Sequence, residues 1–269
     1  MSNTKPKKAY TDGQFGQIHY CSLGDGSPLV LMHQSPTSMI QFDKVWSLLA
    51  ARGFKVIGID LPGFGGSDGP DEVPTVGDYA HIVPAVLDAL DIDKADILGH
   101  HTGAIVATEV ALRHPDHIDR IILNGPLPLT EEERAFFKQH LAKEKEWSPR
   151  EDGSHLTEQW QFRIAAQPGW SDLEAIHRHV VAGAAAWPNA WYPHDAVMAY
   201  DHGAAMARLA HPCLVFSNTG DSIHQIAERT RALRPDFDWA EMQGGTFDII
   251  DEEPEAWVDI VATWLSGNS

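Results

Sequence analysis

The sequence predicts an α/β protein, in which helices cover both faces of a mostly parallel sheet and a helical segment is inserted late in the chain. Short apolar runs, such as 28–32 and 55–59, alternate with amphipathic segments that have helical spacing. This alternation stops between about 126 and 210 and then resumes. A chain of 269 residues is long enough for one large core with an insertion. Because parallel neighbours need crossover connections, the alternation predicts a parallel sheet.

The elements expected outside the insertion are a strand just before Cys21, six further strands and five helices. The six further strands are expected at 28–32, 55–59, 95–98, 118–123, 212–216 and 237–242. The helices are expected at 38–50, 75–90, 103–113, 223–233 and 254–265. Thr75 and Asp78 form a capping-box pattern at the start of the second helix, and Pro84 should kink it.

The chain is expected to divide into three parts: the first part of the core at 1–125, a helical lid (cap) at 126–210, and the second part of the core at 211–269. The lid segment opens with a charged helix at 130–147 and holds five of the nine tryptophans. Large aromatic side chains give a small helical unit a core of its own, which is the preferred interpretation. The alternative is that some of them wall an apolar pocket beneath the lid.

Composition and charge exclude several classes of function. Twenty basic and 38 acidic side chains give a formal charge of −18, which argues against binding nucleic acid or an anionic membrane surface. Cys21 and Cys213 are expected to be buried free thiols, as is usual in a reducing cytoplasm. The N-terminus lacks the pattern of a signal peptide, and no apolar run has the length of a membrane span. We expect a cytoplasmic protein whose partner is a small molecule, and its oligomeric state stays open.

Two motifs carry a resemblance to a known family. The segments 60–68 (DLPGFGGSD) and 98–104 (LGHHTGA) resemble the α/β-hydrolase superfamily, and the order of elements from about Phe15 to Leu265 is similar as well. The second motif resembles the nucleophile elbow, a tight strand-to-helix turn that needs small residues two places before and two places after its centre. The resemblance implies an α/β-hydrolase fold with the side chain of residue 101 in the pocket. That residue is His101 where the family usually has serine.

The loop at 33–38 (HQSPTS) resembles the family's oxyanion-hole loop, to which His33 also belongs. The resemblance implies one backbone N–H donor from about Gln34 or Ser35 and a second from Thr102 at the start of a helix. Gln34 stands where the family usually has glycine, so its side chain is expected to enter the site or to donate to a ligand.

The resemblance also locates a carboxylate and a missing base. Asp221 stands at the position of the family's acid, although an aspartate there would also cap the helix that follows. The family's general-base histidine lies seven residues before a proline, and counting back from Pro254 reaches Phe247. The usual nucleophile and the usual base are therefore both absent, which predicts an atypical catalytic triad.

The remaining groups favour acid/base chemistry. His101 is longer than serine and is expected to reach Asp221, which would give a His–Asp general base. Direct attack by the imidazole and a structural histidine in an inactive pocket are the alternatives. Polar and aromatic groups of the lid that could face the site are Trp187, Trp191, Tyr192, His194, Tyr200 and His202. Either lid histidine could supply the missing base, but bonding within the lid is the preferred interpretation.

The histidines do not predict a metal site. His100 and His101 are consecutive, so on an elbow they are expected to point in different directions. No pair with metal-ligand spacing shares a helix face near the site. Neither a metal nor another cofactor is therefore expected.

The favoured function is an enzyme, a probable hydrolase, that acts on a small, largely apolar carbonyl-type substrate. His101 and Asp221 would activate water, and a backbone oxyanion hole would stabilise negative charge. Two other classes stay open, since the fold hosts varied reactions. One is a non-hydrolytic lyase or isomerase, or a cofactor-free oxygenase; the other is a catalytically silent ligand-binding protein.

Overall fold

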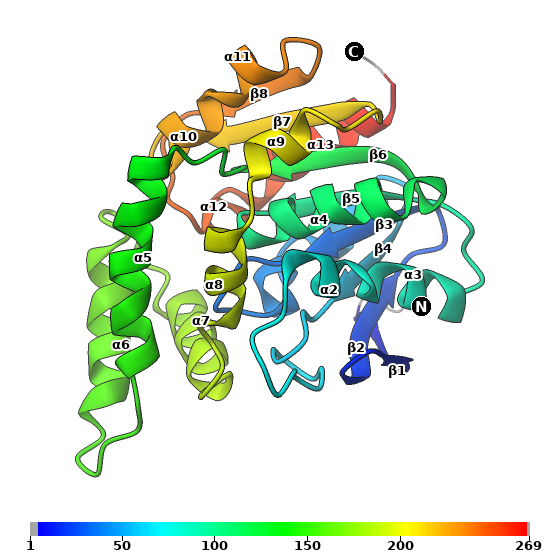
Figure 1. The fold of residues 1–269 in the computed structure, drawn as a ribbon. Coiled ribbons are helices and arrows are strands. Elements are labelled where there is room, and N and C mark those ends of the chain that lie inside the picture. Colours follow the sequence, from blue (N-terminus) through cyan, green and yellow to red (C-terminus); the bar gives the residue numbers. More distant parts are fainter. Residues whose placement is uncertain (1–4, 268–269) are drawn as a thin grey trace.

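The structure, a computed structural model, describes residues 5–267 and is organised around an eight-stranded sheet (Figure 1). The strand order is β1-β2-β4-β3-β5-β6-β7-β8. The strands are β1 Lys7–Gly13, β2 Gly16–Leu23, β3 Ser27–Met32, β4 Phe54–Ile59, β5 Ala95–His100, β6 Ile118–Asn124, β7 Cys213–Asn218 and β8 Asp238–Met242. Strand β2 is antiparallel to β1 and β4, and all other neighbours are parallel. The predicted α/β architecture is confirmed.

Helices cover both faces of the sheet, and each face has its own apolar core. One core lies under α2 Val76–Ala80, α3 Ile82–Ala89 and α4 Thr102–Arg113. The other lies under α1 Trp46–Ala51, α12 Ile249–Glu252 and α13 Pro254–Leu265. Because both faces are covered, β5 and β7 are buried along their whole length, which explains their continuous apolar runs.

Several predicted helices are interrupted. The segment 75–90 starts with the expected Thr75–Asp78 capping box but breaks at His81 into α2 and α3, three residues before Pro84. The expected helix at 38–50 is wrong: a 3₁₀ turn, η1 Met39–Phe42, precedes α1. The backbone N–H of Met39 is held by the Asp60 carboxylate, so side chains fix this segment instead of a continuous helical ladder. The helix expected at 223–233 is divided into α10 His224–Glu228 and α11 Thr230–Leu233.

Strand β1 and the short helix α12 were not predicted, whereas β2 contains the strand expected just before Cys21. Strand β1 lies at the edge of the sheet and buries none of its residues fully. An edge strand of this kind lacks the apolar run that identified the central strands. The connection from β5 to β6 contains a 3₁₀ turn, η2 Pro115–His117, between α4 and β6.

Five helices follow β6, and we call them the inserted helices. They are α5 Glu131–Glu146, α6 Ser154–Ala165, α7 Leu173–Ala185, α8 Tyr192–Ala199 and α9 His202–Met206. Figure 1 shows α5 to α8 gathered at the end of the sheet where α10 follows β7. Buried apolar residues of α5, α8 and α9, including Leu141, Val197 and Met206, belong to the same core as α4.

The tryptophans do not form a separate core for the inserted helices, as the sequence had suggested. None of the five tryptophans in this part of the chain is fully buried, and Trp187 is 45% exposed. Aliphatic side chains make the contact with the core instead. Helices α5, α8 and α9 therefore share the core of the elbow helix α4 and do not pack around a tryptophan core of their own.

The loop at 60–68 is fixed by a buried carboxylate. Asp60 accepts hydrogen bonds from Nδ1 of His19 at 2.7 Å, from the backbone N–H of Met39 at 2.8 Å and from that of Gly66 at 2.9 Å. A Cβ at Gly65 would lie 2.0 Å from the Asp60 carboxylate, so this turn requires glycine. The motif that identified the fold thus ties strand β2 to the loop after β4.

The burial of the two cysteines and the lack of a membrane-length apolar run were also predicted from the sequence. Cys21 and Cys213 are buried free thiols, as expected. Within the described part of the chain, no helix combines the length and the apolar character needed to cross a bilayer.

Candidate active site

The backbone at position 101 has the conformation expected of an elbow. His101 has φ 49° and ψ −110°, a region that non-glycine residues rarely adopt, and it joins β5 to α4. A Cβ at Gly99 would lie 2.1 Å from the carbonyl oxygen of Gly103, and one at Gly103 would lie 2.1 Å from that of Met32. Both glycines are therefore required for the strand and the helix to approach each other.

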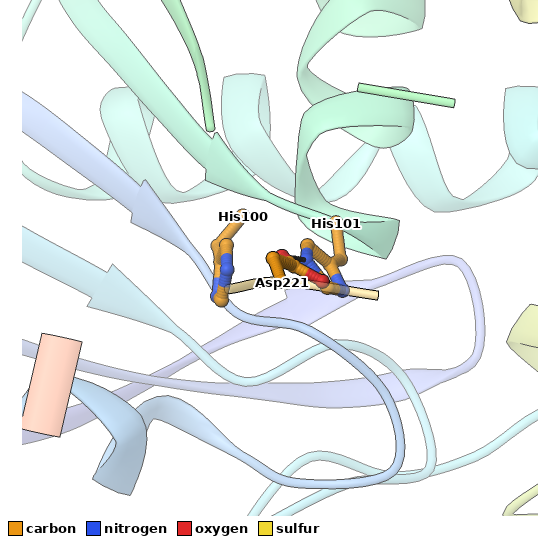
Figure 2. Close-up of side chains that lie close together, drawn as sticks. All are labelled: His100, His101 and Asp221. Atoms are coloured by element: carbon orange, nitrogen blue, oxygen red, sulfur yellow. Dashed lines mark hydrogen bonds and ion pairs between the residues drawn. The ribbon is translucent and has the colours of Figure 1, made fainter. Parts of the chain in front are cut away.

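The imidazole of His101 meets the carboxylate of Asp221. Nε2 of His101 lies 2.6 Å from Oδ2 of Asp221 (Figure 2), and the other carboxylate oxygen accepts the backbone N–H of Ile223 at 3.1 Å. The side chain of His101 is 15% exposed, whereas that of Asp221 is fully buried. Burial alone raises the pKa of Asp221, but the charge and hydrogen bond of His101 outweigh it and hold the pKa below its usual 3.8.

A third glycine makes room for this contact. A Cβ at Gly125 would lie 2.6 Å from Cδ2 and 2.9 Å from Nε2 of His101. Gly125 follows β6 and has φ 66°, which also favours glycine. Any larger residue there would push the imidazole away from Asp221, so Gly125 positions the ring although it carries no side chain.

The contact also determines which nitrogen of His101 is basic. A carboxylate only accepts, so Nε2 donates its hydrogen to Asp221, and in the neutral ring the lone pair is then on Nδ1. In the usual Ser–His–Asp arrangement the opposite nitrogen donates to the carboxylate. If His101 acts as a base, the nitrogen that accepts the proton is therefore Nδ1, which is nearer the backbone than Nε2.

The oxyanion-hole loop differs from the arrangement implied by the resemblance. The backbone N–H of Gln34 donates to Oε1 of Gln41 at 2.9 Å and is therefore already engaged. Both nitrogens of the fully buried His33 bond to backbone: Nδ1 donates to the carbonyl of Gln34 and Nε2 accepts from Leu61. Burial lowers the pKa of His33, in keeping with a neutral ring that holds the loop in place.

Thr102 lies at the start of α4, and Ser35 lies in the loop after β3. Thr102 is the first residue of α4, whose first turn leaves backbone N–H groups without partners inside the helix. Ser35 is partly buried, and its hydroxyl donates to the carbonyl of Ala190 at 3.5 Å. The loop after β3 is thus joined to the segment before α8.

The side chain of Gln34 bonds to a core carboxylate that also binds the inserted helices. Its Nε2 donates to Oδ1 of the buried Asp248 at 2.9 Å. Oδ2 of Asp248 accepts from Arg163 of α6 and from Gln167 just after it. Phe247, the residue at the expected base position, is partly buried, and its ring lies 4.9 Å from the Arg163 guanidinium carbon. Asp248 thus joins the core to the inserted helices where the family has its base.

A second pairing reinforces this junction. Asp251 of α12 accepts from Nε2 of His179 at 2.7 Å and from Arg178 at 3.2 Å. Nδ1 of His179 lies 2.8 Å from Oγ1 of Thr37, in the loop after β3. Helix α7 is therefore fixed to the same part of the core as α6.

The two histidines predicted as alternative bases are engaged elsewhere. Nδ1 of His194 lies 2.7 Å from a carboxylate oxygen of Glu144 within the inserted helices, and the ring also bonds to the backbone of Ser35 in the loop after β3, so the preferred interpretation holds only in part. His202 instead bonds to the core: Nδ1 accepts from Leu127 at 3.2 Å and Nε2 lies 3.0 Å from Oγ1 of Thr108. Burial lowers the pKa of His202 to about 3, so it stays neutral.

The aromatic residues of the inserted helices contact other groups than His101. Trp191 lies over Lys145 at 4.2 Å and packs edge-on against Tyr192, whose hydroxyl donates to the carbonyl of Asp71. The hydroxyl of Tyr200 donates to Glu109 of α4. Together with the exposed Trp187, these residues hold the inserted helices on the core or face solvent.

The expectation that His100 and His101 point in different directions is wrong. Their ring centroids are 4.3 Å apart, and Figure 2 shows the two rings on either side of Asp221. A ring nitrogen of each histidine and a carboxylate oxygen of Asp221 all lie within 4.8 Å of one another. The positive φ of His101 turns the chain sharply, so consecutive side chains converge on the same carboxylate.

Three contributors to the site were missed from the sequence: His100, Gln41 and Asp248. Gln41 connects the N–H of Gln34 to Nδ1 of His100, at 2.9 and 2.5 Å. The doubled histidine in the elbow motif was a visible signal for His100. The contacts of Gln41 and Asp248 join segments far apart in the chain, and no local pattern indicates them.

Comparisons with known proteins identify the family. A haloalkane dehalogenase from Mycobacterium marinum is 34% identical over 125 residues, 45% of this chain and 42% of its own length. A 2-hydroxymuconate semialdehyde hydrolase from Pseudomonas sp. is 34% identical over 116 residues, 40% of this chain and 41% of its own. The chain thus spans about two fifths of the length of the curated relatives it matches.

The solved structure of a thermophilic esterase from Thermogutta terrifontis superposes with a TM-score of 0.77 at 22% identity, covering 98% of both chains, which shows a common fold. A family model of the alpha/beta hydrolase fold matches residues 27–228, most of the chain. The protein therefore belongs to the α/β hydrolase fold family.

Proposed function

We propose that the protein is a hydrolase of a small, largely apolar carbonyl compound, in which His101 acts as a general base oriented by Asp221. The single observation that carries the proposal is the 2.6 Å contact between Nε2 of His101 and Oδ2 of Asp221. One of the relatives named above is a hydrolase by name, the 2-hydroxymuconate semialdehyde hydrolase, which supports the reaction class. An accessible imidazole, held in one tautomer by a carboxylate, is a suitable base at neutral pH.

In this mechanism Nδ1 of His101 takes a proton from water as the water oxygen attacks the carbonyl carbon. The carbonyl π electrons move to oxygen, and the backbone N–H of Thr102 at the start of α4 stabilises the resulting negative charge. When the carbonyl re-forms, the leaving group departs with the proton returned by His101. Asp221 stays ionised throughout and stabilises the imidazolium.

The inserted helices are proposed to act as a lid over this site. Their junction with the core, through Asp248 and Asp251, adjoins the oxyanion-hole loop at Gln34 and Thr37. Substrate binding is then coupled to their position. We also propose a cytoplasmic location, which is supported by the two unpaired cysteines.

Turnover of a panel of p-nitrophenyl esters, lactones and epoxides tests the proposal. We expect activity on the carbonyl substrates, and we expect His101→Asn and Asp221→Asn to lower kcat/KM by about 10²- to 10⁴-fold. Tyr192→Phe is the control: it removes only a hydroxyl that donates to the backbone carbonyl of Asp71, and it should keep wild-type activity. A serine-directed phosphonate should leave the protein unlabelled. Wild-type turnover by His101→Asn, or no turnover by the wild type, would contradict the proposal.

A further inference from the structure

One buried polar atom beside the dyad has no function in the mechanism above. The side chain of His100 is fully buried, and among residues 5–267 its Nε2 has no hydrogen-bond partner. A buried polar nitrogen without a partner costs free energy, so an atom of this kind in a candidate site points to a missing ligand. Nε2 belongs to the ring that lies 4.3 Å from the ring of His101.

A chain of hydrogen bonds determines whether this nitrogen carries a hydrogen. The backbone N–H of Gln34 can only donate, so the Gln41 atom that it contacts at 2.9 Å is the amide oxygen. The amide nitrogen of Gln41 then donates to Nδ1 of His100. A neutral imidazole has one donor and one acceptor nitrogen, so the hydrogen of His100 is on Nε2. Burial lowers the pKa of His100 well below 6.5 and keeps the ring neutral.

The same chain of hydrogen bonds engages Gln34, one of the two residues, Gln34 and Ser35, whose N–H the resemblance offered to the oxyanion hole. The N–H of Gln34 donates to Gln41, and Gln41 donates to Nδ1 of His100. The hydrogen of His100 is therefore on Nε2, the nitrogen that lacks a partner. Both oxygens of Asp221 already accept, one from His101 and one from Ile223. The N–H of His100 is thus a donor beside the base that lacks an acceptor.

We propose that Nε2–H of His100 donates a hydrogen bond to the carbonyl oxygen of the substrate, in place of the backbone N–H of Gln34. This inference rests on the proposed hydrolase function. As water attacks and the carbonyl electrons move to oxygen, His100 and the N–H of Thr102 bind the developing negative charge, and the proton of water goes to Nδ1 of His101. Because Nε2 is shielded from solvent here, the substrate reaches it only when the structure opens around His100.

A divalent metal bound by His100, His101 and Asp221 is the competing explanation. A metal needs the lone pair of Nε2, which would place the hydrogen of His100 on Nδ1, directly facing the amide N–H of Gln41. The 2.6 Å contact between His101 and Asp221 would also have to open, because two ligands of one metal ion lie farther apart. The hydrogen bonds therefore favour the donor.

The tautomer is measured directly by long-range ¹H–¹⁵N NMR on protein labelled at its histidines. We expect the signals lost in His100→Phe to show a protonated Nε2 and an unprotonated Nδ1. The opposite tautomer would overturn the proposal. So would Zn²⁺ binding to the wild type that His100→Gln abolishes, measured by calorimetry. These readouts need no activity, so they test the donor even if the proposed hydrolase function fails.

Kinetics on the p-nitrophenyl ester that the wild type hydrolyses fastest then test the role in catalysis. His100→Phe keeps a ring but has no donor, and it should lower kcat by about 10²- to 10³-fold with little change in KM. His100→Gln can place an amide N–H near the position of Nε2 and should recover part of the rate. Wild-type kcat in both variants, with unchanged thermal unfolding, would overturn the proposal. Absence of turnover in the wild type would instead overturn the proposed function.

Discussion

At position 101 the exchange of a hydroxyl for an imidazole changes which partners the site needs. A serine requires a separate base, whereas His101 spans the distance to Asp221 without one, and Gly125 leaves room for its ring. Phe247 is therefore no obstacle to this chemistry, because nothing needs to stand between residue 101 and the carboxylate. Phe247 stands where the family has its histidine, and the next residue, Asp248, binds the inserted helices through Arg163 and the core loop through Gln34.

His19 gives a residue-scale prediction about stability and pH. Its hydrogen bond to Asp60, together with that to Cys21, raises the pKa of His19 to about 9. Since the pKa is raised on folding, the stabilisation is complete below pH 6.5 and is lost as the pH rises through 9. We expect His19→Gln to lower the free energy of unfolding by about 2 kcal/mol at pH 6, and this difference should shrink toward pH 9.5.

Urea unfolding of both proteins between pH 6 and 9.5 measures this difference. His140→Gln, at an exposed histidine bonded only to a backbone carbonyl, is the control and should match the wild type at every pH. A difference for His19→Gln that stays constant across this range would show that the raised pKa does not contribute to stability.

At the scale of elements, the elbow depends on the close approach of β3, β5 and α4. Gly103→Ala places a Cβ 2.1 Å from the carbonyl oxygen of Met32 and 2.9 Å from that of His33, both backbone atoms that cannot move freely. We expect this variant to lose at least about 3 kcal/mol of stability. Thermal and urea unfolding measure the loss.

Gly203 in α9 provides the matched control for this substitution. A Cβ there would meet its nearest atom at 3.6 Å, an ordinary contact. Gly203→Ala should therefore leave stability unchanged or raise it by up to about 1 kcal/mol, since alanine favours helix. Equal effects of the two substitutions would show that backbone crowding does not explain the glycine at the elbow.

Element by element, the sequence was informative where one local rule dominated. Central strands such as β5 bury both faces and were predicted from their apolar runs, and the Thr75–Asp78 capping box predicted the start of α2. The edge strand β1 has no such run. The 38–50 segment has helical spacing, but the N–H of Met39 bonds to Asp60 and the side chain of Gln41 bonds to Gln34 and His100, contacts that periodicity cannot indicate.

The residues of the candidate site were also predictable only where a local pattern marks them. The elbow glycines and His101 are adjacent in the chain, so a steric rule located them. Asp221 was located by its position in the fold and could not be found from spacing alone. His100 and His101 were expected to point in different directions because they are consecutive. Both approach Asp221 because the φ of His101 is positive, a backbone angle that the sequence does not indicate.

At the scale of the whole molecule, the inserted helices and the core form a continuous packed structure. Apolar residues of α5, α8 and α9 share one core with α4, and the buried carboxylates of Asp248 and Asp251 hold α6 and α7 from the other side. Because Asp248 also binds the side chain of Gln34, the position of α6 is coupled to the oxyanion-hole loop. Loosening this junction should therefore affect stability and activity together.

Two ion pairs of α6 allow this coupling to be tested. Arg163 reaches the fully buried Asp248, whereas Arg150, just before the helix, pairs with Glu158 on the surface. Arg163→Met leaves the buried carboxylate with its two amide donors and with His179, whose Nε2 lies 3.8 Å from Oδ1 of Asp248. We expect a loss of about 3 kcal/mol of stability, faster proteolysis of the inserted helices and lower kcat/KM. Arg150→Met should match the wild type in all three, because exposed pairs contribute little. If Arg163→Met reduced stability but left kcat/KM unchanged, the junction would be structural only, and the coupling of the inserted helices to the Gln34 loop would have to be abandoned.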